Sequence, residues 1–184
     1  MILEIVKYAD PVLRKKGKSI PVINTKIRKL AEDMIDTMRA ENGVGLAAQQ
    51  VGEALQLTVL EIPEMEERPS TMTLNGKPCD FLKWMPLTLI KPQLILGKER
   101  EIGVEGCLSF PEINEEISRS ISVIAKAQLL DGTFIEFEAT GLLARALQHE
   151  VDHLNGVLFI DRMNSAIKTS LAGKLKRMQR ENQA

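Results

Sequence analysis

Two histidines restrict the structure of this chain more than any other feature. The sequence contains only His149 and His153, and they enclose Glu150 in the run HEVDH. Two histidines placed at random would stand four residues apart in only about 1% of cases. Residues 141–155 carry apolar side chains at helical spacing, and residues four apart lie on one face of a helix. Both imidazoles can therefore bind one metal ion, with Glu150 able to reach a water molecule beside it. The alternative is a helix with two ordinary core histidines.

The third ligand of such a site has to come from the chain before the histidines. After His153 there is no other histidine and a single glutamate, Glu181, in the polar tail. Phe159 occupies the place of the third histidine in extended zinc-protease motifs. A thiolate is the natural candidate, and Cys107 stands in the run EGCLS, which suits a loop or strand end with an accessible sulfur. The alternative is that Cys107 is a small buried hydrophobe.

Composition is that of one globular domain over residues 1–184. Hydrophobic residues make up 44% and charged residues 27%, which excludes a disordered or collagen-like chain. The net charge of −1 and 4% aromatic residues argue against a surface that grips DNA. Two cysteines are too few for a secreted disulfide scaffold. The N-terminus lacks a signal-peptide pattern. No apolar run reaches the length of a membrane span. We expect a reducing, cytoplasmic setting and no membrane partner.

Hydrophobic periodicity predicts a mixture of helices and strands. Helical spacing of apolar residues predicts helices at 25–40, 141–155 and 165–179. Alternating or continuous apolar runs predict strands at 55–62, at 87–96 and within 117–137, with a hairpin turn at Asp131-Gly132.

Two segments differ in composition from the rest. Residues 63–86 contain four prolines, the Asn75-Gly76 turn signal and clustered glutamates, and we interpret them as a loop or hairpin insertion. Residues 165–184 form a basic C-terminal helix and tail: from Arg162 onward six basic residues face one acid, a net charge of +5. A solvated helix face is one interpretation of that charge, and a docking surface is the other.

The run GVGLAAQQ at residues 43–50 formally matches a dinucleotide-binding fingerprint. That fingerprint requires a preceding strand, whereas a helix is predicted before these glycines. A glycine turn can instead allow a peptide to approach the backbone closely while a glutamine amide meets a polarised carbonyl.

Three motifs together resemble the peptide deformylase family. GVGLAAQQ resembles its GxGLAAxQ motif, EGCLS is similar to its motif of the same letters, and QHEVDHLNG at 148–156 resembles QHExDHLxG. The motifs occur in the family order, and DPVLR at 10–14 resembles the family's N-terminal segment. The resemblance spans about residues 5–163 and is interrupted by the insertion. It implies an α+β fold: antiparallel sheets packed around a central helix that carries the HExxH motif, plus a C-terminal helix.

The resemblance also implies an activity, a hydrolysis in protein biosynthesis. The formyl group would be removed from the initiator N-formylmethionine of nascent bacterial-type polypeptides, releasing formate. Cys107, His149 and His153 would bind the metal. The family favours Fe(II), one ion per chain, with Ni(II), Co(II) or Zn(II) as substitutes.

The remaining site residues are also carried over by resemblance. Glu150 would take a proton from water and return one to the departing nitrogen, and the Gln50 amide and the Leu108 N–H would meet the oxyanion. The methionine side chain would lie among these pocket residues: Val44, Gly45, Leu142 and Ala146.

Outside these positions the resemblance supports further hypotheses. Arg145 would lie over the pocket or point to solvent. Around the metal ligands we expect supporting contacts from Glu105, Arg119 and Asp152. The basic tail would dock on the ribosome near the exit tunnel.

Three other functions compete with this one. An HExxH zinc endopeptidase uses the same water and glutamate, but the chain has no third histidine or glutamate ligand in the right place. A metal-stabilised binding domain would have no use for Glu150 or Gln50. A deformylase-like metallohydrolase acting on another N-acylated amine remains the alternative that pocket residues alone do not exclude.

Overall fold

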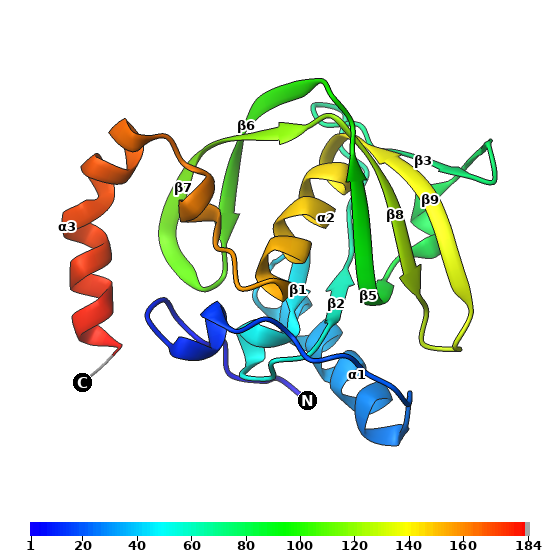
Figure 1. The fold of residues 1–184 in the computed structure, drawn as a ribbon, viewed down its shortest axis with the longest axis horizontal. Helices are drawn as coiled ribbons and strands as arrows, with labels where there is room; N and C mark the ends of the chain where they lie inside the picture. Colours follow the sequence, from blue (N-terminus) through cyan, green and yellow to red (C-terminus); the bar gives the residue numbers. More distant parts are fainter. Residues whose placement is uncertain (183–184) are drawn as a thin grey trace.

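The computed structural model describes residues 1–182 as one mixed α and β arrangement (Figure 1). It contains three α-helices and four short 3-10 helices: α1 (Thr25–Ala40), α2 (Gly141–Leu154), α3 (Ser165–Glu181), η1 (Pro11–Arg14), η2 (Ala48–Val51), η3 (Phe81–Trp84) and η4 (Phe159–Arg162). No helix among residues 1–182 is long and apolar enough to cross a membrane. The predicted helices at 25–40 and 141–155 are confirmed, and α3 runs two residues beyond its predicted end at 179.

Seven strands form one antiparallel sheet in the order β1-β2-β5-β8-β9-β3-β4. Their bounds are β1 (Gly45–Ala47), β2 (Leu57–Leu60), β3 (Thr71–Leu74), β4 (Lys77–Cys79), β5 (Leu87–Leu96), β8 (Ser122–Gln128) and β9 (Phe134–Thr140). A separate antiparallel pair consists of β6 (Arg100–Cys107) and β7 (Phe110–Ser120). The predicted α+β class with antiparallel sheets is therefore confirmed.

Helix α2 lies between the large sheet and the β6–β7 hairpin (Figure 1). Leu143 and Leu147 are fully buried and belong to the core cluster that contains the inward side chains of β5, β8 and β9. The helix begins at Gly141, whose φ of +64° and close approach to Pro69 leave no room for a side chain. Because most of α2 is buried, the polar residues on it need partners inside the protein.

The strand predictions are correct for the centre of the large sheet, miss β1, and are incomplete for the β6–β7 hairpin. The strand at 87–96 is β5, the strand at 55–62 is shortened to β2, and the turn at Asp131-Gly132 joins β8 to β9. The predicted strands within 117–137 correspond to β8 and β9, but their predicted start is wrong, because Ile117 lies within the preceding strand β7. β6 was missed, since its sequence REIGVEGC is charged and glycine-containing and only one of its residues, Glu105, is buried.

The segment 63–86 contains a hairpin with the predicted turn. Asn75 and Gly76 both have positive φ, 51° and 74°, and join β3 to β4. β3 pairs with β9, which makes the hairpin the last two strands of the large sheet. That the segment is an insertion within one catalytic domain remains a prediction.

Helix α3 packs beside the β6–β7 hairpin (Figure 1). One face carries apolar residues at helical spacing that pack against buried Leu13, Phe110 and Phe159: Ile167, Leu171, Leu175 and Met178. The remaining face is basic. Residues 183 and 184 of the predicted tail lie outside the described part of the chain.

Candidate active site

Three side chains with metal-binding atoms meet beside α2. Cys107 is the last residue of β6, and His149 and His153 lie one turn apart on α2. The sulfur and one ring nitrogen of each histidine all lie within 4.8 Å of one another. Cys107 Sγ is 3.3 Å from His153 Nε2. The fold therefore brings together the three ligands predicted from the sequence, although 42 residues separate Cys107 from His149 in the chain.

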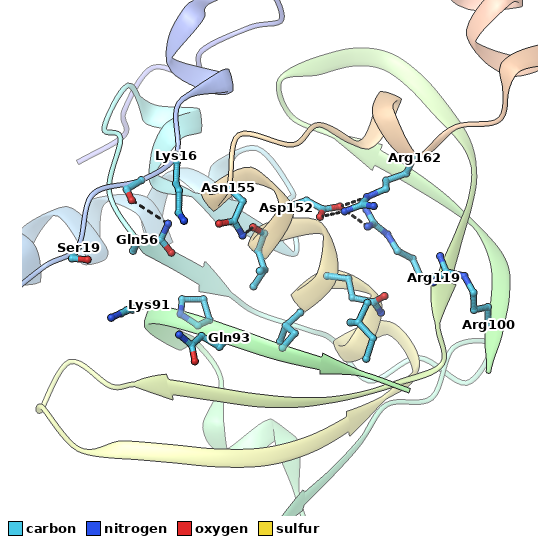
Figure 2. A pocket seen from close by; sticks show the side chains of 16 residues that line it. Lys16, Ser19, Gln56, Lys91, Gln93, Arg100, Arg119, Asp152, Asn155 and Arg162 are labelled. Atoms are coloured by element: carbon cyan, nitrogen blue, oxygen red, sulfur yellow. Dashed lines mark hydrogen bonds and ion pairs between the residues drawn. The ribbon is translucent and has the colours of Figure 1, made fainter. Parts of the chain in front are cut away.

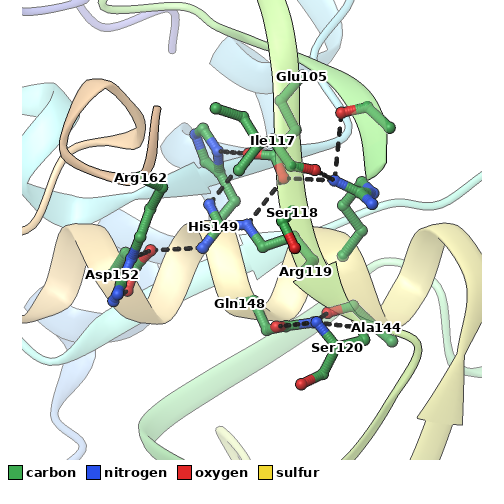
Figure 3. Close-up of polar contacts among 12 residues, drawn as sticks. Glu105, Ile117, Ser118, Arg119, Ser120, Ala144, Gln148, His149, Asp152 and Arg162 are labelled. Carbon is green, nitrogen blue, oxygen red and sulfur yellow. Dashed lines mark hydrogen bonds and ion pairs between the residues drawn. The ribbon is translucent and has the colours of Figure 1, made fainter. Parts of the chain in front are cut away.

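A carboxylate fixes the orientation of His149 (Figure 3). Glu105 Oε2 lies 2.9 Å from His149 Nδ1, which leaves Nε2 of the ring for the metal side. Burial raises the pKa of Glu105, but the hydrogen bonds from His149 and Arg119 outweigh it and lower the pKa to about 2. Glu105 is therefore a carboxylate, and it accepts the proton on Nδ1 of His149.

Arg119 extends this contact away from the site. Its Nε and Nη2 donate to the two oxygens of Glu105 at 2.8 and 3.0 Å, and its Nη1 donates to Asp152 at 2.6 Å. Arg119 and Glu105 are both almost fully buried, so each needs the other. The supporting contacts expected among Glu105, Arg119 and Asp152 are present.

Glu150 lies in the site with a free carboxylate oxygen. It is 4% exposed, and its Oε2 is one of the buried side-chain atoms without a hydrogen-bond partner among residues 1–182. Burial raises the pKa of Glu150 to about 7. A carboxyl group of that pKa can both accept and donate a proton near neutral pH.

The three ligand residues fit a metal ion. Burial lowers the pKa of His153, so its ring is neutral, as a ligand must be. His149 presents Nε2 because Glu105 occupies Nδ1, and Cys107 supplies a sulfur. A thiol with two imidazoles is a donor set that suits zinc, iron, nickel or cobalt.

Gln50 directs its amide at the sulfur. Gln50 Oε1 accepts from the backbone N–H of Ala47 at 2.9 Å, which fixes the amide orientation. Gln50 Nε2 then lies 3.5 Å from Cys107 Sγ and 3.3 Å from Ser109 Oγ. Leu108 follows Cys107, and its carbonyl accepts from Lys7 Nζ at 2.9 Å.

A cleft of about 490 Å³ opens onto these residues. His149, Glu150, Gln50 and Cys107 line it, together with Leu108. The four pocket residues predicted from the sequence also line it: Val44, Gly45, Leu142 and Ala146. The arrangement places an acid–base group, amide hydrogens and two of the three candidate metal ligands, Cys107 and His149, in the wall of a partly apolar cleft.

Arg145 was expected either to lie over the pocket or to point to solvent, and the structure excludes the second position. It is 4% exposed, so it does not point to solvent. Its Nη1 donates to Glu105 at 3.0 Å and to the carbonyl of Ile117 at 2.8 Å, which holds β7 and Glu105 together under the cleft wall. The sequence contained no signal for this contact, because β6 and β7 were not predicted as a pair.

Lys7 and Arg68 also line the cleft and were missed. Arg68 Nη1 donates to the carbonyl of Val104 at 3.1 Å. Both residues come from segments without a motif, so only the tertiary structure reveals them. Ser109, which accepts from Gln50, was within reach of prediction because it ends the EGCLS run.

Comparison with known proteins finds one family throughout. A family model described as polypeptide deformylase matches residues 2–169. The peptide deformylase of Methylacidiphilum infernorum is 43% identical over 180 residues, covering 98% of this chain and 94% of that protein. The crystal structure of peptide deformylase from Thermotoga maritima is 38% identical with a TM-score of 0.73, covering 89% of this chain and 99% of that one. A class I type b peptide deformylase from Acinetobacter baumannii, solved with Met-Ala-Ser bound, is 28% identical with a TM-score of 0.77, covering 89% and 99%.

Proposed function

The chain belongs to the polypeptide deformylase family of metal-dependent hydrolases, and we propose that it removes the formyl group from the N-formylmethionine of nascent polypeptides, releasing formate. The observation that carries this proposal is the position of Glu150, which lines the cleft together with Cys107 and His149, two of the three residues whose metal-binding atoms meet. A binding domain would have no need of a buried carboxyl group with a free oxygen at that place.

Cys107, His149 and His153 are the residues that would hold the metal. A bound divalent ion would acidify water and polarise the formyl carbonyl. We propose Fe(II) as the physiological ion, with Ni(II), Co(II) or Zn(II) as substitutes, because the donor set suits all four and the family resemblance favours iron. Metal content and activity after anaerobic loading with each ion would rank them.

Glu150 would move the protons of the reaction. Its carboxylate takes a proton from the water that attacks the formyl carbon, and its carboxyl group then gives a proton to the departing amine nitrogen. The pKa of about 7 supports both steps, since neither protonation state is strongly favoured near neutral pH. The products are formate and the free amino terminus.

Gln50 and Leu108 would stabilise charge on the formyl oxygen. Because Gln50 Oε1 is held by Ala47, the amide can offer only its hydrogens toward Cys107 and the site. The backbone N–H of Leu108 is the second proposed donor.

The methionine side chain would occupy the apolar part of the cleft, between Val44 and Gly45 on one side and Leu142 and Ala146 on the other. The relative from Acinetobacter baumannii is described as bound to Met-Ala-Ser, a peptide that begins with methionine. That description supports a peptide of the same kind as the ligand of this cleft.

The test is formate release from formyl-Met-Ala-Ser by protein loaded anaerobically with Fe(II). Glu150→Gln keeps the size of the side chain and removes its acid–base function, so it should lose activity while it retains the metal. Release by the parent protein alone supports the proposal. A folded, metal-loaded protein that leaves this peptide intact but hydrolyses acetyl-Met-Ala-Ser would favour the alternative, a metallohydrolase of another N-acylated amine.

We also propose that α3 docks on the ribosome, where the substrate emerges. Lys176, Arg177 and Arg180 are exposed on α3, opposite the face that packs on the hairpin. Charge reversal of these three residues should reduce co-sedimentation with ribosomes without changing activity on a free peptide, and undiminished co-sedimentation would refute the proposal. A cytoplasmic location follows from this proposal and is tested with it.

A further inference from the structure

Helix α2 also borders a second cavity (Figure 2). The residues of α2 that line this cavity recur at helical spacing: Gln148, Val151, Asp152 and Asn155. Those that line the cleft follow another stripe: Leu142, Arg145, Ala146, His149 and Glu150. The two cavities share no lining residue, and the second has a volume of about 450 Å³. That volume is sufficient for a small ligand.

The second cavity has an excess of positive charge. One carboxylate, Asp152, lines it against five cationic side chains: Lys16, Lys91, Arg100, Arg119 and Arg162. Arg119 is paired with Glu105 and Asp152, and Arg162 is also paired with Asp152. Lys16, Lys91 and Arg100 have no ion pair with any residue in the range 1–182. Arg100 donates to the hydroxyl and the carbonyl of Ser118 at 3.1 and 2.7 Å, so the ammonium groups of Lys16 and Lys91 are the charges that remain available to an anion.

The cations stand in two groups (Figure 2). Lys16 and Lys91 lie at one side with the polar side chains of Ser19, Gln56 and Gln93, and the arginines lie at the other side. The lysine side suits a phosphate, because ammonium groups are point charges that bind phosphate oxygens.

The rest of the lining suits an apolar or aromatic group. Pro92, Leu94 and Val151 contribute apolar surface, and guanidinium planes such as that of Arg100 can stack on a flat ring. Inorganic phosphate alone would leave this surface unused. The lining as a whole therefore combines anion recognition with a place for a ring.

We propose that this cavity binds a phosphate monoester of nucleotide size. Its phosphate lies at the side of Lys16 and Lys91, and its ring lies against Leu94 and Val151 toward the arginines. The site is separate from the peptide cleft, and so the ligand is neither substrate nor product of the proposed deformylation.

The experiment is calorimetric titration of the metal-loaded protein with guanosine 5′-monophosphate, guanosine and inorganic phosphate. The monophosphate should bind to one site per chain, and the nucleoside and inorganic phosphate should each bind at least about tenfold more weakly. Addition of saturating Met-Ala-Ser should leave the affinity unchanged, because the peptide occupies the other cavity.

The double variant Lys16→Glu, Lys91→Glu should weaken monophosphate binding at least about tenfold. The matched control is Lys77→Glu, Lys83→Glu, which changes the net charge equally on β4 and η3, outside the cavity lining. The proposal is wrong if the monophosphate does not bind, if both double variants weaken binding equally, or if Met-Ala-Ser displaces the nucleotide. Binding of an oligonucleotide without binding of the mononucleotide would also overturn it.

Discussion

Gly45 packs directly against the carboxyl group of Glu150. A Cβ atom built on Gly45 would lie 2.9 Å from Glu150 Cδ and even closer to its Oε1, a separation that real Cβ atoms do not show. The glycine at this position of the GVGLAAQQ run therefore makes room for the group that would move protons. This contact joins two motifs that are 105 residues apart.

Gly45→Ala should displace the Glu150 side chain and reduce kcat/KM by about a hundredfold or more, since a small misplacement of a catalytic group has a large effect on rate. Metal content should not change, because the three atoms nearest to a Cβ at this position all belong to Glu150. Steady-state formate release with metal analysis measures both. Gly173→Ala is the control, as no atom lies within 4 Å of a Cβ there. Full activity of Gly45→Ala would show that Glu150 tolerates displacement or has no role in proton transfer.

Cys107→Ser should abolish stable metal binding, because the thiolate is replaced by a weakly acidic hydroxyl. Cys79→Ser is the matched control: it changes the other free cysteine of the chain, which lies in β4 and is outside the three-ligand set. Elemental analysis after gel filtration reads out both variants. Equal metal content in the two proteins would exclude Cys107 as a ligand.

Arg119→Ala should weaken metal retention about tenfold to a hundredfold, an effect typical of groups that orient a ligand. Without Arg119 the buried Glu105 loses two hydrogen bonds and holds His149 less firmly. Competition with a chelator measures the change in affinity, and Arg177→Ala on the exposed face of α3 serves as the control. The same chelator resistance in Arg119→Ala and the parent protein would contradict the role assigned to this contact.

The sequence predicted which three residues come together as candidate ligands better than it predicted the contacts that support them. His149 and His153 are local to one helix, so their spacing alone placed them on one face. The EGCLS motif is distinctive enough to indicate Cys107 as a candidate ligand without a prediction of the strand that carries it. The sequence does not decide the position of Arg145, because that position depends on the β6–β7 hairpin, whose charged and exposed residues do not show strand periodicity.

In the fold as well, elements set by local sequence are predicted better than contacts between distant segments. Helix α1 and strand β5 agree with prediction because α1 carries apolar residues at helical spacing and β5 is a largely apolar run. The order of strands in the sheet joins β9 to β3, which lies over 60 residues earlier in the chain, and periodicity has no information on such pairing. Only the family resemblance indicated antiparallel sheets around α2.

Asp161 should make the stability of the protein depend on pH under acidic conditions. Burial raises the pKa of Asp161, but the hydrogen bond from Arg14 and the one from the backbone of Leu158 outweigh it, and the pKa falls below its usual value. The folded state therefore favours the carboxylate more than the unfolded state does. The resulting stabilisation is present above the unfolded pKa of about 3.8 and is lost as pH falls through the folded pKa.

Asp161→Asn should remove this dependence. The Tm of the variant should be lower than that of the parent protein at pH 6, and the difference should shrink steadily as the pH falls below about 4. Glu64→Gln, which changes an exposed carboxylate with no ion pair among residues 1–182, should follow the parent protein at every pH. A constant difference in Tm between Asp161→Asn and the parent across the whole range would show that Asp161 acts by its shape or hydrogen bonding, and that its charge pair with Arg14 contributes nothing.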